Sequence, residues 1–193
     1  MSEIAANKYL LKILLDFLYR DYMEQEIRVE IISDAPRIFT TEGFIELVKG
    51  AEYILPRRIA YELAAKGIVK IKDEELTLES LSKIVYNEEA TQHKPQLSKI
   101  SPFIYFIILR RLGEIEKKLR SEGSLELFEE YRNITDLYTT LMKIRVRKLL
   151  SILQMIEVPQ DTIEKMSEEE KILFGLMRST LKEWKKKLGI EKG

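Results

Sequence analysis

The character of the chain changes at one five-residue stretch, Ile27-Arg28-Val29-Glu30-Ile31, in which apolar and polar residues alternate. A period of two is typical of a β-strand with one buried face. Before it, residues 4–24 carry leucines at helical spacing and predict an amphipathic helix that Ser2 would cap. After it, the sequence predicts a turn at 34–36 and short strands at 38–40, 44–47, 53–55 and 68–71.

A short helix is expected between the last two of these strands. Pro56 stands where it would open the helix, since proline is favoured in the first turn, and Gly67 stands where it would end it. Several short strands and one short helix within about 45 residues indicate a compact α+β module. We place its end near residues 72–77.

From Leu76 onward the sequence predicts helices only. Apolar stripes cover the regions 78–85, 103–119, 125–156 and 168–188, with a loop at 91–99. Ser167-Glu168-Glu169-Glu170 has the pattern of a capping box at the start of the last helix. The expected fold class is therefore α+β, mainly α. We expect an N-terminal helix plus a small β module over 1–75 and an α-helical assembly domain over 76–193.

Composition excludes several classes of protein. The 32 Lys and Arg residues balance the 32 Asp and Glu residues, which argues against a protein dominated by nucleic-acid binding. The absence of cysteine among the 193 residues excludes disulfides, zinc ribbons and thiol catalysis. Together with abundant Ile, Glu, Lys and Arg it is typical of an intracellular protein of a thermophile. No apolar stretch is long enough for a membrane span, so we expect a cytoplasmic protein without membrane contact.

The sequence offers no catalytic constellation. It has no glycine-rich phosphate loop, and its one histidine, His93, lies in a predicted polar loop. The adjacent carboxylates Glu88-Glu89 and 73–75 do not converge on one site, so we interpret them as solvated surface. We expect no enzyme activity, no cofactor and no metal site. A hidden carboxylate metal site at Glu88 and Glu89 is the enzymatic alternative.

Binding surfaces have better candidates. The basic clusters 143–148 and 182–187 are either solvated helix faces or contacts to phosphate or to an acidic partner. The run 103–109 is apolar nearly all round, so one of its sides lies either in the core or in a subunit interface. Aromatic residues and arginine are enriched in interfaces. The candidate interface residues are Phe103, Tyr105, Phe106, Arg110, Arg111, Tyr131, Tyr138, Arg145 and Trp184.

The order of these features resembles the GINS family of DNA replication factors. The resemblance is carried first by Val29-Glu30-Ile31-Ile32-Ser33-Asp34-Ala35-Pro36, followed by Leu47-Val48-Lys49-Gly50-Ala51 and Leu55-Pro56-Arg57. In the helical part it is carried by Leu97-Ser98-Lys99-Ile100-Ser101-Pro102-Phe103 and by Leu141-Met142-Lys143-Ile144-Arg145-Val146-Arg147-Lys148. It covers about residues 27–190, and the helix at 4–24 is an addition to the family pattern.

The resemblance implies a non-catalytic scaffold. A β module that precedes the helical domain is similar to the archaeal subunit related to the eukaryotic Psf-two and Psf-three class. Implied partners are the helical-domain-first GINS subunit, in a two-plus-two hetero-tetramer, the MCM replicative helicase and a RecJ-like nuclease-family protein. The alternative is a direct DNA-binding module, in which 55–71 forms a winged-helix-like unit and Arg57, Arg58 and Lys66 contact phosphates.

Overall fold

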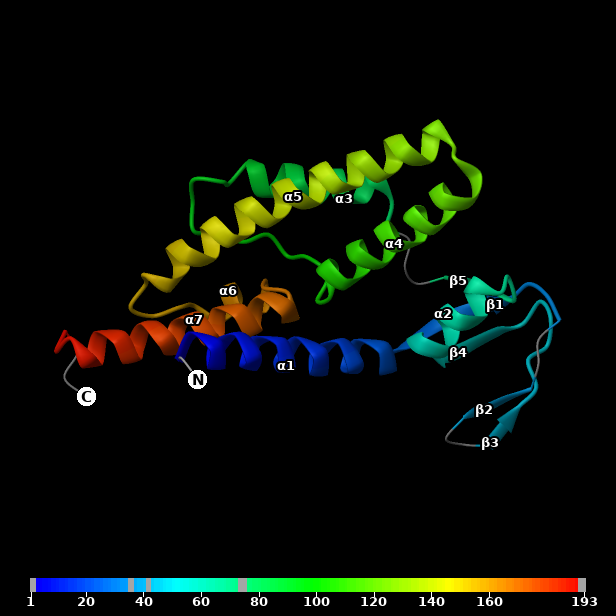
Figure 1. The fold of residues 1–193 in the computed structure, drawn as a ribbon, viewed down its shortest axis with the longest axis horizontal. Helices are drawn as coiled ribbons and strands as arrows, with labels where there is room; N and C mark the ends of the chain where they lie inside the picture. Colours follow the sequence, from blue (N-terminus) through cyan, green and yellow to red (C-terminus); the bar gives the residue numbers. More distant parts are fainter. Residues whose placement is uncertain (1–2, 35–36, 41–42, 73–75, 191–193) are drawn as a thin grey trace. The chain divides into compact units, whose positions relative to one another are not determined.

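A computed structural model of the chain describes residues 3–34, 37–40, 43–72 and 76–190, with the backbone alone at 3–7 and 39–40 (Figure 1). The chain divides into two compact units. One is Phe17–Glu75, named here the β unit. The other combines Met1–Asp16 with Leu76–Gly193 and is named the helical unit. The contacts thus divide the range 1–75 between the two units, at Asp16 and Phe17.

The β unit is built around the strand that the alternating stretch predicted. β1 (Glu26–Ile31) is the central strand of a three-stranded antiparallel sheet, between β4 (Glu52–Pro56) and β5 (Val69–Ile71). Ile27, Val29 and Ile31 are buried and Arg28 is exposed, so the predicted alternation is confirmed. A separate hairpin pairs β2 (Ile38–Thr40) with β3 (Gly43–Ile45).

One helix packs on the sheet, and its ends follow the predicted signals. α2 (Arg57–Ala65) begins directly after Pro56, and the chain turns at Gly67 with φ +68°. Ala60 and Leu63 are buried in one cluster with the apolar residues of β1, β4 and β5. The last part of α1 (Glu3–Glu24) also belongs to this unit, where the Tyr22 hydroxyl bonds the Tyr61 hydroxyl at 2.8 Å.

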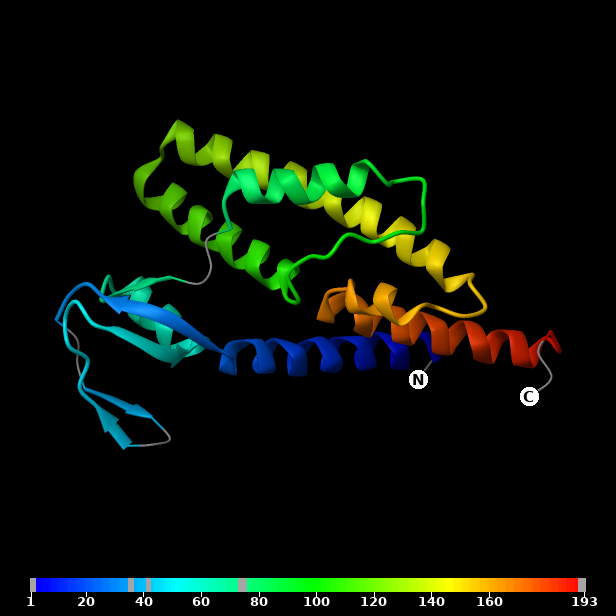
Figure 2. The same cartoon turned by 180° about the vertical axis from the view of Figure 1, so that it is seen from behind.

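The helical unit is organised by its longest helix, α5 (Leu125–Leu153). α3 (Leu78–Glu89) and α4 (Ile104–Glu122) both pack against α5, as Figures 1 and 2 show from two sides. α4 and α5 form an antiparallel hairpin, because Gly123 ends α4 at φ +61° and Ser124 caps α5. α6 (Gln160–Glu164) and α7 (Glu168–Lys187) complete the unit.

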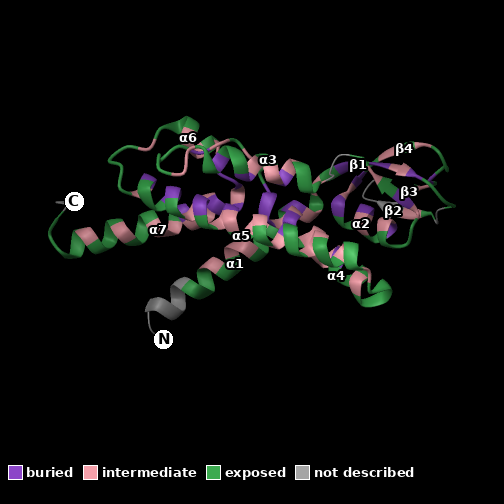
Figure 3. Ribbon diagram, turned by 90° about the horizontal axis from the view of Figure 1, so that it is seen from above, coloured by how far each residue is buried: buried purple, intermediate pink, exposed green. Residues whose placement is uncertain are grey.

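Two apolar clusters hold the helical unit together. The larger one joins Leu81 of α3 with Ile104 and Ile108 of α4 and Leu141 of α5. The smaller one lies near the other end of α5, where Ile152 packs with Phe174 of α7. Figure 3 shows this concentration of buried residues along α5. The mainly α, α+β fold class is therefore confirmed.

Element boundaries differ from the predictions at a few places. α5 ends at Leu153, before the predicted end at Ile156, and the short α6 follows Pro159. The capping box of α7 is present, with Ser167 and Glu170 bonding each other's backbone N–H. The expected cap at Ser2 and most of the expected turn at 34–36 lie outside the described residues. No helix in the described ranges is long and apolar enough to cross a membrane.

Candidate functional site

The most unusual feature of the helical unit is a pair of buried basic residues on α5. Arg145 is fully buried and Lys148 is 1% exposed. They lie on the same stripe of α5 as Leu141 and Ile152, at spacings of four, three and four residues, which is the stripe that faces the core. Buried charges need compensating partners, because the cost of removing an ion from water is several kcal/mol (about 3–5 when one partner is missing).

The first compensating carboxylate comes from the last turn of α3. Glu88 is fully buried and accepts from Arg145 Nη1 at 3.0 Å and from Lys148 Nζ at 2.5 Å. The Ser98 backbone N–H donates to the same carboxylate at 2.7 Å. Burial raises the pKa of Glu88, but the hydrogen bond from Lys148 and the charge of Arg145 outweigh it, so the pKa lies below its usual value. Glu88 is therefore held as a carboxylate.

The second carboxylate comes from the first turn of α7. Glu170 accepts from Arg145 Nε at 2.8 Å and from Arg145 Nη2, in a bidentate pair. The Tyr105 hydroxyl of α4 donates to it at 2.6 Å, and the Ser167 N–H donates at 3.0 Å. Burial and the adjacent Glu170 raise the pKa of Tyr105, which keeps the phenol protonated as a donor.

Every hydrogen-bond donor of the two basic groups has an acceptor. Arg145 also donates to the Ser98 carbonyl at 3.0 Å and the Lys165 carbonyl at 2.9 Å, which accounts for all five of its N–H groups. Lys148 uses its three N–H groups on the Glu88 side chain, the Glu88 carbonyl and Thr91 Oγ1. We name Glu88, Tyr105, Arg145, Lys148 and Glu170 the buried charge network.

This network has the properties of a structural element that fixes the arrangement of the helices. Its two positive and two negative groups cancel, and its donors are fully used by the chain itself. It joins α3, α4, α5, α7 and the loop at Ser98, so it fixes how these elements stand against one another. Within the described part of the chain, no three His, Asp or Glu side chains form a group that could hold a metal ion.

One carboxylate beside the network is incompletely paired. Glu169 is 8% exposed, and its Oε1 accepts from the Phe106 N–H at 3.2 Å. Its Oε2 is buried without a hydrogen-bond partner. Burial raises the pKa of Glu169 above its usual value, because the hydrogen bonds that it accepts do not offset the loss of water.

The predicted interface residues divide into three groups. Phe103, Tyr105 and Arg145 are buried, so their side chains contact this chain rather than solvent. Trp184, near the end of α7, is 55% exposed. The remaining five are half-buried and are Phe106, Arg110, Arg111, Tyr131 and Tyr138.

Several half-buried candidates already have partners inside the helical unit. Arg110 pairs with Glu114 at 2.6 Å, and Arg111 pairs with Glu130 at 2.5 Å. Tyr138 meets the Tyr105 ring edge-on, with ring centroids 6.2 Å apart. A partner subunit would contact the outer sides of these residues, and their interface role stays a prediction.

The interpretation of residues 143–148 as a solvated or partner-facing basic cluster is wrong for Arg145 and Lys148. Both are buried, and only Lys143 and Arg147 are exposed. The interpretation of Glu88 as solvated surface is wrong for the same reason, since it neutralises them. The signal that could have located the network is the core stripe Leu141, Arg145, Lys148, Ile152, in which two charges replace apolar residues.

The winged-helix alternative loses one of its three phosphate contacts. Arg57 is buried, with its guanidinium 4.5 Å from the centroid of the Tyr22 ring and a hydrogen bond to the Tyr61 hydroxyl. Arg58 pairs with Glu24 at 2.8 Å. Both arginines thus contact the end of α1. Arg58 and Lys66 are exposed, so these two remain of the expected set.

Neither a model of a known protein family nor any curated protein sequence matches this chain.

Proposed function

We propose that this chain is a non-catalytic scaffold subunit of the GINS type that acts in DNA replication. In this proposal it assembles with the helical-domain-first GINS subunit, in a two-plus-two hetero-tetramer. The assembly links the MCM replicative helicase to a RecJ-like nuclease-family protein and supports fork unwinding. The chain contributes binding surfaces and no reacting groups.

The order of the modules is the observation that carries the proposal. A small antiparallel sheet with one packed helix, over 26–71, precedes an all-helical region from Leu78 to Lys187. The segments that resemble the family lie in both modules. Val29–Ile31 belongs to the central strand, Leu55–Arg57 joins β4 to α2, and 141–148 is the part of α5 that contains Arg145 and Lys148 of the buried charge network.

The buried charge network supports a scaffold role. A fully satisfied polar network makes a core rigid and specifies one arrangement of its helices. Rigid helices present a fixed outer surface, which lowers the entropic cost of binding a partner.

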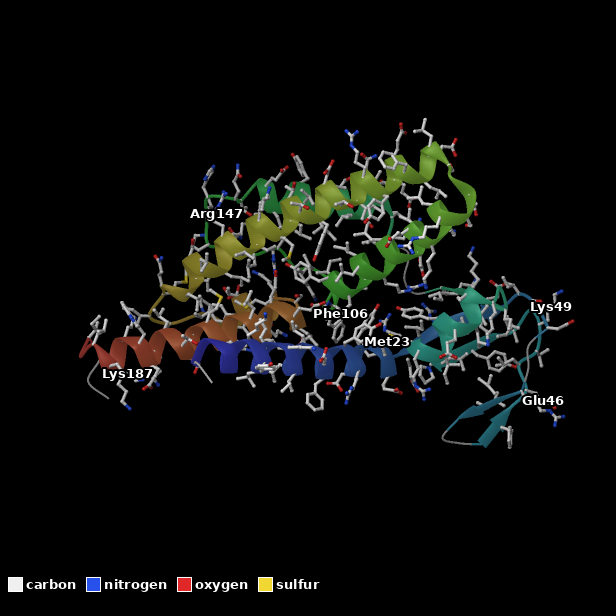
Figure 4. All side chains as sticks on the ribbon, in the orientation of Figure 1. Met23, Glu46, Lys49, Phe106, Arg147 and Lys187 are labelled. Carbon is white, nitrogen blue, oxygen red and sulfur yellow. The ribbon has the colours of Figure 1, made fainter. Side chains whose placement is uncertain are left out.

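The outer side of α4 is the surface we propose for the GINS partner. Leu109 is 51% exposed, and Phe106 and Arg110 are half-buried on either side of it. Figure 4 labels Phe106 in the first turn of α4. Aromatic residues and arginine are enriched in protein interfaces, and the exposed leucine adds apolar area for a partner to cover.

The test is co-purification of this chain with the helical-domain-first subunit, followed by light scattering on a sizing column. We expect one complex with a mass well above that of the 22.7 kDa chain. A mixture in which the chain elutes as a separate 22.7 kDa monomer contradicts the proposal.

A further inference from the structure

Two exposed surfaces of opposite charge lie within the helical unit. The first is the last part of α7 with the residues after it, 178–190, which we name the α7 end. It contains five basic residues and one acidic residue. None of its residues is buried, and Trp184, Leu188 and Ile190 are all more than half exposed. This is a basic surface with an uncovered apolar stripe.

The second surface is the turn between α4 and α5, residues 122–130, which we name the hairpin tip. It contains the four acidic residues Glu122, Glu126, Glu129 and Glu130 and no basic residue. Leu125 is 72% exposed and Phe128 is 55% exposed. Glu130 pairs with Arg111, and the flanking Arg120 pairs with Glu116. Glu122, Glu126 and Glu129 therefore give this surface its acidic character, beside its own uncovered apolar side chains.

The two surfaces cannot meet within one chain. Figures 1 and 2 show the hairpin tip and the α7 end at opposite ends of the helical unit, with α5 between them. The 29 residues of α5 span about 43 Å at 1.5 Å per residue. The surfaces can meet only between two copies.

We propose that a second copy of this chain docks its α7 end on the hairpin tip of the first, in a head-to-tail contact. The charges of the two surfaces are complementary, and each offers large apolar side chains that the other would cover. Binding of nucleic acid to the α7 end would not account for the acidic hairpin tip and its exposed Phe128. A contact between two copies accounts for both surfaces. The inference is independent of the proposed GINS function, which uses the outer side of α4.

Charge reversal at both surfaces provides the test. In the first variant, Lys182→Glu and Lys186→Glu reverse two exposed lysines one turn apart on α7. In the second, Glu126→Lys and Glu129→Lys reverse two exposed glutamates of the hairpin tip. The matched control is Lys143→Glu with Arg147→Glu, which makes the same charge change at the same spacing on exposed positions of α5. Figure 4 labels Arg147 on α5 and Lys187 at the α7 end.

Sedimentation velocity is measured over a range of protein and salt concentrations. We expect the wild type and the control to associate in low salt and to dissociate as salt screens the charges. Each reversed variant alone should stay monomeric, with at least a tenfold weaker self-association. An equimolar mixture of the two should associate again, because the carboxylates introduced at positions 182 and 186 of one variant can pair with the ammonium groups introduced at positions 126 and 129 of the other.

Three outcomes overturn the inference. The first is a wild type that is monomeric at every concentration. The second is a control that loses association as fully as the reversed variants. The third is a mixture that stays monomeric although both variants keep the circular dichroism and melting transition of the wild type. Loss of binding to a labelled oligonucleotide in Lys182→Glu/Lys186→Glu, without wild-type self-association, would assign the α7 end to nucleic acid instead.

Discussion

Arg145 and Glu170, which stand 25 residues apart in the sequence, are joined by two hydrogen bonds in the interior of the helical unit. Glu88, which precedes Arg145 by 57 residues, accepts a hydrogen bond from Nη1 of the same guanidinium. The interior of the helical unit thus holds buried ion pairs at positions where apolar side chains would be expected to pack. The consequences for stability can be measured.

Replacing Arg145 should strongly lower the stability of the protein. Arg145→Met leaves Glu170 without its bidentate partner and Glu88 with Lys148 alone. We expect the free energy of unfolding in urea to fall by about 3–5 kcal/mol, which is typical when one partner of a buried ion pair is deleted. Arg147→Met, two residues away and exposed, is the control and should change it by less than about 0.5 kcal/mol. Equal effects of the two variants would contradict the network.

Lys148 and Glu88 should be energetically coupled. Lys148 donates to the Glu88 carboxylate and to the Glu88 backbone carbonyl, and the substitution Glu88→Gln changes only the first of these two acceptors. We expect the double variant Lys148→Met/Glu88→Gln to be more stable than the sum of the single losses predicts, with a coupling of about 1–3 kcal/mol. The measurement is a double-mutant cycle by urea unfolding. Additive losses would show that the two groups act separately.

Glu169 should destabilise the protein at neutral pH. Burial raises its pKa in the folded state, so the folded protein favours the protonated form, and the charged form is penalised above that raised pKa. This penalty disappears as the pH falls through the raised pKa of Glu169. Glu169→Gln should therefore raise the free energy of unfolding by about 1 kcal/mol at about pH 7 and leave it unchanged near about pH 4.

The neighbouring Glu168→Gln is the control for this pH dependence. Glu168 is a partly exposed residue that pairs with Lys171 at 2.6 Å. Its replacement should give no gain at any pH. A Glu169→Gln variant that is less stable than the wild type at about pH 7 would contradict the assignment.

Two glycines of one helical hairpin should respond to alanine in opposite directions. Gly123 has φ +61°, where a Cβ is strained, so Gly123→Ala should lower the free energy of unfolding by about 1 kcal/mol. Gly113 lies inside α4 with no atom within 4 Å of an added Cβ. Gly113→Ala should raise the free energy of unfolding by about 0.5–1 kcal/mol. Thermal melts of both variants provide the comparison.

The outer side of α4 should decide binding to the partner subunit that the proposed function requires. Leu109→Asp introduces a charge at an exposed position of the proposed interface, and we expect it to weaken the complex at least tenfold. Leu150→Asp is the matched control, since Leu150 is a leucine of similar exposure on α5. The measurement is titration calorimetry with the partner subunit. Equal weakening by both variants would place the interface elsewhere.

Short-range patterns in the sequence specify most of the elements and their order. The alternation at Ile27–Ile31, the Pro56 and Gly67 signals around α2, and the capping box at Ser167 and Glu170 each act within a few residues. Local backbone preferences and side-chain periodicity suffice to specify such features, because they do not depend on a distant part of the chain. The mainly α, α+β fold class followed from them.

Which charged side chains are buried depends on contacts between distant parts of the chain. In the sequence, Arg145 and Lys148 resemble the exposed Arg147 beside them, and Glu88 resembles any surface glutamate. A charged side chain can be buried at low cost only where opposite charges and hydrogen-bond acceptors are positioned to replace water. For Arg145 these come from α3 and α7, which the sequence separates by about eighty residues and the fold brings to one guanidinium.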